Sequence, residues 1–354
     1  MVYTTAFRQE GYKLLVLQGV AVFLFLFVVF QIRSANSIHP PTSIEEMYYQ
    51  IYMSRIEGKI TQEKLDWLRE KDKEFEPIYQ LDRDFKNGVI TRKQYNIGMD
   101  SYTVLQQKMN IFHNVIQRLQ SLPEAERPRT QLVYETGWLR LFDIKDSQSL
   151  TETLLISLLT PLCFAGFFAM EKQTGMVKVI SCTPLGREKT VQYKLVWTTI
   201  ICGIIAFFSV FPRLFVVLRY DGLGAWFAPV YSIAEYAKAP EIPLFAMMLL
   251  LFFSRFVAVV FIAFVTLVLS EKIGNGFAAM FLSVLLFSVP VLLSMVGVVS
   301  AKWVSLYPVV HSTAILAEKN GAIMVMMLLF IGISICYCCY TYLIQHFGYI
   351  KKRT

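Results

Sequence analysis

The sequence lacks the short motifs by which a chain binds nucleotide phosphates or carries out common hydrolytic reactions. It has no Gly-x-x-x-x-Gly-Lys-Ser/Thr loop to cradle ATP phosphates, and Gly186–Thr190 resembles one only superficially. The signatures of zinc proteases and serine hydrolases, His-Glu-x-x-His and Gly-x-Ser-x-Gly, are missing as well. We therefore expect no enzyme active site, no ATPase site and no metal site in this chain.

Charged residues are scarce, at 17% of the chain, whereas hydrophobic residues make up 55%. A helix needs roughly 20 apolar residues to cross the ~30 Å hydrocarbon core of a membrane. Six runs reach or approach that length: Leu14–Phe30, Leu154–Met170, Leu195–Phe211, Leu244–Leu269, Phe277–Val299 and Ala322–Ile344. Buried core helices do not account for six such runs, so the sequence predicts an all-α integral membrane protein with six transmembrane helices.

Carboxylates are absent from these runs, apart from Glu152 at the outer edge of the second. Ion-coupled transporters often use carboxylates inside the membrane, and intramembrane aspartyl proteases require them, so both classes are disfavoured. Arg255 lies eleven residues into the fourth run, and a charge at that depth must face protein, water or a lipid headgroup. Either it lines a substrate path, or it packs against helix dipoles or carbonyls.

The first run could be a cleaved signal peptide, but it is long and no small-residue cleavage site follows it. We therefore expect a retained helix, preceded by an interfacial helix at the N-terminus. With the N-terminus inside, eleven Lys and Arg residues flank the runs on the cytoplasmic side, and the two short outer loops hold five. The bias predicts that both termini are cytoplasmic.

Residues 34–148 are expected to form a helical extracytoplasmic domain between the first two membrane helices. Ser43 begins a capping-box pattern with Glu46, and Thr61 and Thr91 are placed as helix caps in a faint repeat. The amphipathic stretch from Val104 to Leu119 extends over more than four turns. A bundle or hairpin of about four helices is predicted, without disulfides because the segment contains no cysteine.

The net charge of +8 comes from the membrane part, because residues 34–146 hold 16 basic and 17 acidic residues. We expect interfacial anchoring to membrane lipids and no binding of nucleic acid. Cys336, Cys338 and Cys339 cluster in the last run, but no histidine lies at ligand spacing. Packing accounts for these cysteines better than a metal or a lipidation site does.

The loop at residues 171–194, between the second and third runs, is the most informative stretch. Charged residues stand where the second run leaves the membrane, and a short helix with apolar Met176 and Val179 is predicted after them. Thr183-Pro184 would end this helix. Basic residues then lead the chain back into lipid. This pattern fits a helix that docks on a cytosolic partner or an ordinary loop.

The arrangement Glu-x-x-x-Gly, apolar residues, Thr-Pro-x-x-Arg and a later Lys resembles the coupling loop of ABC-2 type permeases, the membrane subunits of ATP-binding cassette exporters. The matching residues are Glu171, Gly175, Thr183, Pro184, Arg187 and Lys194. The segment Gly222–Leu244 and short re-entrant helices within Ala301–Asn320 would also fit that family. The enlarged first outer loop resembles a subgroup whose substrates are diverse.

The resemblance implies three parts: residues 1–33 as interfacial helix and first span, 34–148 as outer domain, and 149–354 as five further spans with the coupling loop. It implies an exporter of an amphipathic, peptide or lipid-like substrate. ATP and magnesium would bind to a separate cytosolic ATPase subunit, and a second permease, of the same or a homologous chain, would complete a dimer. The expected location is the plasma membrane of a bacterium. The alternative is a membrane-anchored receptor or scaffold whose outer domain binds a ligand; an embedded enzyme is a third, weaker one.

Overall fold

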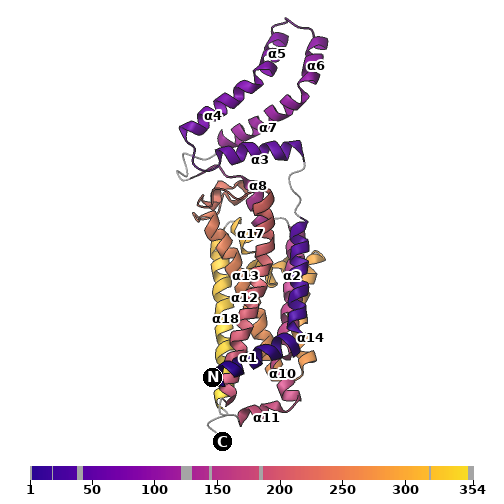
Figure 1. Cartoon of the computed structure of the whole chain (residues 1–354), viewed down its shortest axis with the longest axis vertical. Coiled ribbons are helices and arrows are strands. Elements are labelled where there is room, and N and C mark those ends of the chain that lie inside the picture. The colour runs from indigo at the N-terminus through magenta and orange to yellow at the C-terminus, as the bar shows by residue number, and fades with distance from the viewer. Residues whose placement is uncertain are drawn as a thin grey trace. The chain divides into compact units, whose positions relative to one another are not determined.

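The computed structural model of the chain describes residues 2–17, 19–37, 43–120, 130–142, 146–182, 186–318 and 320–349. Its elements are helices throughout (Figure 1). Among these residues no strand occurs, and the extended pairing is limited to two isolated bridges, Gly58 with Leu132 and Pro229 with Pro243. The predicted all-α class is confirmed.

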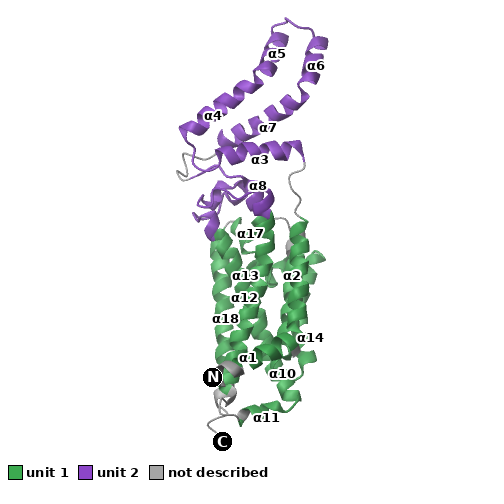
Figure 2. Ribbon diagram, in the orientation of Figure 1, with its two compact units in different colours: residues 1–37, 141–216, 247–354 green, residues 38–140, 217–246 purple. Residues whose placement is uncertain are grey.

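The chain divides into two compact units, each built from separate segments (Figure 2). Unit 1 contains Met1–Ser37, Leu141–Val216 and Met247–Thr354. Unit 2 contains Ile38–Arg140 and Val217–Ala246. The second segment of unit 2 was not expected, because residues 217–246 read in the sequence as an outer loop of the membrane part.

Unit 1 is a bundle of long apolar helices joined by short ones. Its helices are α1 (Val2–Tyr12), the π-helix η1 (Lys13–Leu17), α2 (Val20–Asn36), α9 (Asp146–Phe164), α10 (Gly166–Gln173), α11 (Met176–Ser181), α12 (Gly186–Tyr220), α13 (Leu244–Ile273), α14 (Gly276–Met295), α15 (Val299–Val304), α16 (Tyr307–Val310), α17 (Ser312–Leu316) and α18 (Gly321–Tyr349). Its core joins α9, α12 and α13, with residues such as Phe164, Ile201 and Ile262 fully buried. Short helices are present where the sequence predicted them, before α18.

Among the described residues, five helices are long and apolar enough to cross a membrane: Leu150–Gln173, Glu188–Tyr220, Leu244–Ile273, Gly276–Met295 and Gly321–Gln345. A sixth crossing requires that Phe7–Val16 and Val20–Asn36, which are bent by 60°, count together. The predicted run from Leu14 is therefore not one straight helix. Gly19, with φ at 69°, is in the left-handed conformation at the start of α2, so the helix begins anew there.

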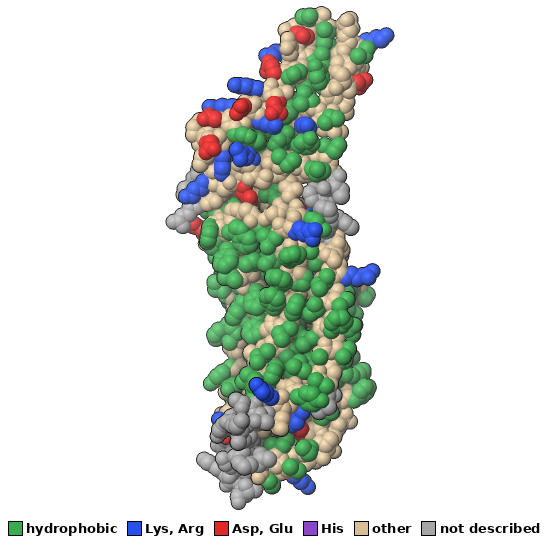
Figure 3. All heavy atoms as spheres, in the orientation of Figure 1, with side chains coloured by type: hydrophobic (Ala, Val, Ile, Leu, Met, Phe, Trp, Pro, Cys, Tyr) green, Lys and Arg blue, Asp and Glu red, His purple; other side chains and the backbone are tan. Residues whose placement is uncertain are grey.

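The outer surface of unit 1 is apolar. Phe330 and Met326 on α18 are 73% and 70% exposed, and Phe277 on α14 is 73% exposed. In Figure 3 hydrophobic side chains dominate the face over α12, α13 and α18. Exposed apolar area on this scale is what a lipid-facing protein presents, so unit 1 reads as a multi-pass membrane part.

The described residues of the first segment of unit 2 form five longer α-helices, with a short 3₁₀ helix between the second and the third. They are α3 (Ile44–Ile56), α4 (Gln62–Asp72), the 3₁₀ helix η2 (Lys73–Phe75), α5 (Glu76–Lys86), α6 (Arg92–Ser101) and α7 (Thr103–Gln120), followed by α8 (Glu135–Phe142), which begins in this unit. Ser43 caps α3 by accepting the Glu46 N–H at 3.0 Å, and Thr91 forms a capping box with Gln94. Thr61 occupies the N-cap of α4 without a side-chain bond.

The core of unit 2 lies between α3, η2 and α7. Phe75, Phe112 and Ile78 are fully buried there, and the Phe75 and Phe112 rings lie 5.3 Å apart. The amphipathic helix predicted near Val104–Leu119 is confirmed as α7, which buries Met109, Ile111, Phe112 and Val115.

The segment 217–246, with 3₁₀ helices η3 (Val230–Ser232) and η4 (Ala234–Tyr236), is bonded to the rest of unit 2. The Gln50 amide donates to the carbonyls of Tyr220 and Asp221 at 2.8 and 2.9 Å. Arg140 pairs with Asp221 at 2.7 Å, and Arg118 donates to the Ser232 carbonyl at 2.9 Å. These bonds make the two segments one folded unit.

Candidate coupling site

The residues predicted for coupling lie where α10, α11 and α12 of unit 1 follow one another. Glu171 is in the last turn of α10, and Gly175, with φ at 70°, forms the left-handed N-cap of α11. Lys194 lies on α12. Thr183 and Pro184 lie outside the described residues; Arg187 is in the first turn of α12, and its side chain is likewise outside the description.

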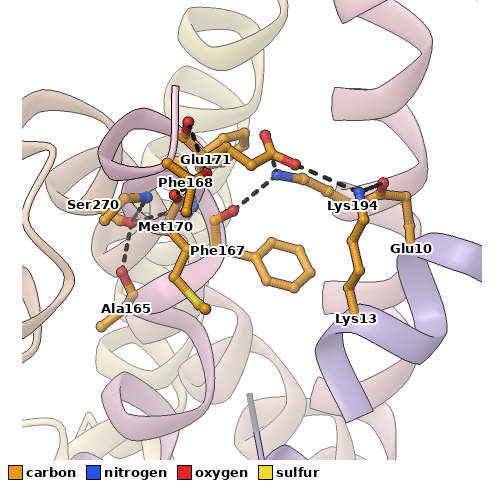
Figure 4. Close-up of polar contacts among 11 residues, drawn as sticks. Glu10, Lys13, Ala165, Phe167, Phe168, Met170, Glu171, Lys194 and Ser270 are labelled. Carbon is orange, nitrogen blue, oxygen red and sulfur yellow. Dashed lines mark hydrogen bonds and ion pairs between the residues drawn. The ribbon is translucent and has the colours of Figure 1, made fainter. Parts of the chain in front are cut away.

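Glu171 and Lys194, at the two ends of the predicted loop, form an ion pair (Figure 4). The Lys194 Nζ lies 2.7 Å from a carboxylate oxygen of Glu171 and donates to the Phe167 carbonyl at 2.8 Å. It also lies over the Phe168 ring, 4.7 Å from the centroid. Lys194 is only 2% exposed, so this ammonium is held by the protein and not by water. The pair closes the base of the loop that carries α11.

The N-terminal helix joins the same cluster through two residues that sequence reasoning did not single out. Lys13 Nζ lies 2.7 Å from the Glu10 carboxylate and 3.9 Å from that of Glu171. Glu10 is 7% exposed. The sequence shows only that Glu10 and Lys13 are three residues apart. This spacing does not reveal that Glu10 is buried, so sequence reasoning could not assign either residue to the cluster.

Helix α1 is fixed on α12 by aromatic contact. The Phe7 and Trp197 rings stack with centroids 5.0 Å apart, and the Trp197 Nε1–H donates to the Phe7 carbonyl at 3.0 Å. Gly11 permits the close approach, because a Cβ there would collide with the Trp197 indole. The N-terminal helix is therefore attached to the helix that carries Lys194.

The other side of α10 is attached to the end of α13. Lys172 pairs with the Glu271 carboxylate at 2.9 Å and donates to the Glu271 carbonyl. The Ser270 hydroxyl donates to the Ala165 carbonyl at 2.6 Å and accepts the Ala169 N–H at 3.1 Å, at the break between α9 and α10 (Figure 4). The base of the loop is thus joined to η1, α12 and α13 together.

Helix α11 has an inner and an outer face. Val177 and Ile180 are half-buried and line a small cavity of about 10 Å³ beside Lys194. Met176 and Val179 form the more exposed, outer face, at 43% and 58% exposed, and Lys178 lies between them in the sequence. A second hollow of about 150 Å³ is lined by Met176, Met170, Thr174, Phe167, Glu10, Lys13, Glu171 and Lys194. The outer face of α11 is therefore apolar at Met176 and Val179.

Arg255 lies elsewhere in unit 1 and is 2% exposed. It donates to both carboxylate oxygens of Glu152, at 2.6 and 3.0 Å, and to the carbonyls of Ser209 and Val310, at 2.6 and 3.3 Å. The expected packing against carbonyls is present, and the pairing with Glu152 was not predicted. Its place on a substrate path stays a prediction.

No group of three or more His, Cys, Asp or Glu side chains is placed to hold a metal ion in the part of the chain that the structure describes. Comparison of the chain with protein-family models, with curated proteins and with solved structures finds no match.

Proposed function

We propose that the chain is the membrane subunit of an exporter driven by ATP hydrolysis on a separate cytosolic subunit. The observation that carries the proposal is the Glu171–Lys194 pair, which closes a loop whose tip displays an exposed apolar helix. The motif residues at both ends of the loop meet at 2.7 Å. This arrangement suits a loop that transmits a movement of the ATPase subunit to the membrane helices without bending at its own base.

Transmission requires that the loop be joined stiffly to the helices that move. Packed and hydrogen-bonded elements transmit displacement because protein interiors are close-packed. Through Glu171 the loop acts on η1 and α12, and through Lys172 and Ser270 it acts on α13. A displacement of α11 would therefore reach three helices of unit 1 at once.

The outer face of α11 is the contact offered to the ATPase. Met176 and Val179 would enter an apolar cleft of the partner, and Lys178 would meet acidic groups at its rim. ATP and magnesium belong to that partner. The exposed apolar helices α14 and α18 would contact lipid and a second permease. The amphipathic substrate would cross the membrane between the two permease subunits.

Purification of the tagged chain in mild detergent, followed by mass spectrometry of the co-purifying chains, tests this function. We expect a stoichiometric subunit with a Gly-x-x-x-x-Gly-Lys-Ser/Thr loop. Met176→Asp with Val179→Asp should remove it, because two carboxylates would be buried unpaired in the contact.

Val89→Asp provides the matched control, since Val89 is 70% exposed and lies in unit 2. It should leave the ATPase bound. A preparation that keeps other complexes intact and contains no ATPase contradicts the proposal and favours a receptor or scaffold whose outer domain binds a ligand.

A further inference from the structure

An aromatic ledge, made of Trp226, Phe227 and Phe245, lies in the second segment of unit 2. Phe227 is 81% exposed and Phe245 is 40% exposed. With Ala225 and Gln131 these residues line an open groove of about 490 Å³. An exposed aromatic groove of this size calls for an occupant, since soluble surfaces seldom leave such area in water.

The ledge is held in a fixed form by its neighbours. The Trp226 ring packs edge-on against Trp138, with centroids 5.2 Å apart, and Trp138 donates its Nε1–H to the Gly224 carbonyl at 3.2 Å. Ala225 has φ at 47°, a left-handed conformation that residues with a Cβ atom rarely adopt. The surroundings hold the backbone in a strained turn that presents Phe227 outward.

Backbone bonds place the ledge at the first turn of α13. The Phe245 N–H donates to the Trp226 carbonyl, and the Leu244 N–H to the Ala228 carbonyl, each at 2.9 Å. The helix that starts at Leu244 is one of those long and apolar enough to cross a membrane. The ledge therefore lies beside the first turn of a candidate membrane span.

The ledge continues the apolar face of that helix. Phe245, Leu249, Phe252 and Phe253 follow a spacing of four, seven and eight residues, which places them on one side of a helix. Leu249, Phe252 and Phe253 are 49%, 37% and 46% exposed. Along α13 the exposed apolar positions thus continue up to Phe245 without a polar interruption.

From this continuity we propose that the ledge binds a phospholipid of the surrounding leaflet. Aromatic side chains favour the boundary between acyl chains and headgroups. The upper acyl chain would lie against Trp226, Phe227 and Phe245, and the carboxamide of Gln131 can donate to an ester carbonyl. The ledge then fixes the depth of the first turn of α13. This inference does not depend on an ATPase partner.

Depth-dependent quenching tests the proposal on the full chain in phosphatidylcholine nanodiscs. Phe227→Cys is labelled with a small fluorophore after Cys182→Ser and Cys338→Ser remove the two exposed native thiols. Part of the lipid carries bromine either near the glycerol end or near the methyl end of the acyl chain. Val89→Cys, labelled in the same way, is the control in unit 2.

We expect strong quenching at position 227 by the shallow bromines, weaker quenching by the deep ones, and none at position 89. Quenching at 227 by aqueous iodide alone would overturn the proposal, because the groove would then face water or a protein partner. Equal lipid quenching at both positions would also overturn it, because the contact would not be confined to the ledge. Both substitutions replace exposed side chains, so folding is preserved.

Discussion

The Arg255 guanidinium binds both carboxylate oxygens of Glu152, although 103 residues separate the two in the chain. The pair connects α13 to α9, and through the carbonyls of Ser209 and Val310 it also reaches α12 and α16. Nearby, the hydroxyls of Ser254 and Ser312 lie 2.7 Å apart. A polar junction therefore joins α9, α12, α13 and α16 inside the apolar bundle, and the Ser254–Ser312 contact adds α17.

Removing one partner of the junction should destabilise unit 1 strongly. Arg255→Met leaves the Glu152 carboxylate buried without its cation, and Glu152→Leu leaves the guanidinium, each at a cost of about 3–5 kcal/mol. The double variant should unfold at a higher temperature than either single variant, because no unpaired charge remains. Thermal unfolding in detergent measures this.

Arg69→Ala is the control, since it breaks an exposed Arg69–Asp66 pair with Arg69 73% exposed. Its midpoint should match that of the wild type. A double variant less stable than both single variants would contradict this prediction, because an unpaired buried charge would then carry no extra cost.

Gly11→Ala should detach α1 from α12, because the added Cβ collides with the Trp197 indole. Alanine in a helix is ordinarily more stable than glycine by about 1 kcal/mol, so a loss here has a steric cause. We expect faster tryptic cleavage at Arg8 and Lys13. Gly203→Ala on α12, where the nearest atom to a Cβ is 3.9 Å away, should leave the cleavage rate unchanged.

Glu57 should make the stability of unit 2 depend on pH. Burial raises the pKa of its carboxyl group, although the Tyr134 N–H, which donates to it at 3.1 Å, and Lys64 act in the opposite direction. Because the folded pKa exceeds the unfolded value of about 4.3, the stabilisation is complete below that value and is lost as pH rises through the folded pKa. Hydrogen exchange of the Gly58 and Leu132 amides, which bond across this turn, reports the effect.

Glu57→Gln removes the titration and should flatten the pH dependence of that exchange, measured as free energy of opening after correction for intrinsic rates. Glu63→Gln changes an exposed carboxylate and should leave the slope as it is. An unchanged slope in Glu57→Gln would assign the pH dependence to another group.

Phe112→Ala should unfold or loosen unit 2, since the ring is fully buried between α3, η2 and α7. A cavity of this kind costs about 3–5 kcal/mol. Val104→Ala, at a position 56% exposed on the same helix, is the control. Proteolysis within residues 43–120 of the full chain should rise for Phe112→Ala alone.

Local signals in the sequence predicted local structure well. Ser43 and Thr91 cap helices as their side chains allow, and α13 begins at Leu244, the first residue of its apolar run. These features depend on residues close together in the chain. The bend in the first apolar run also has a local cause: Gly19 interrupts the helix, and hydropathy does not register a left-handed turn.

Relations between distant segments were not readable. The sequence placed Glu152 at an edge and Arg255 near mid-depth, and the pairing depends on how far one helix slides along another. Likewise, the loop motif indicated Glu171 and Lys194 separately, but Glu10 and Lys13 enter their cluster only through the packing of Phe7 on Trp197. Helix offset and helix docking are set by side-chain fit, which one sequence does not report.

The two-segment construction of unit 2 sets an order for its synthesis. Residues 217–246 supply hydrogen-bond and ion-pair partners to Gln50, Arg118 and Arg140. This segment leaves the ribosome only after α9 to α12 have been made. The first segment must therefore remain incomplete while two apolar helices enter the membrane. An excised fragment that ends at Arg140 would lack those partners, and a stable soluble version needs both segments joined by a linker.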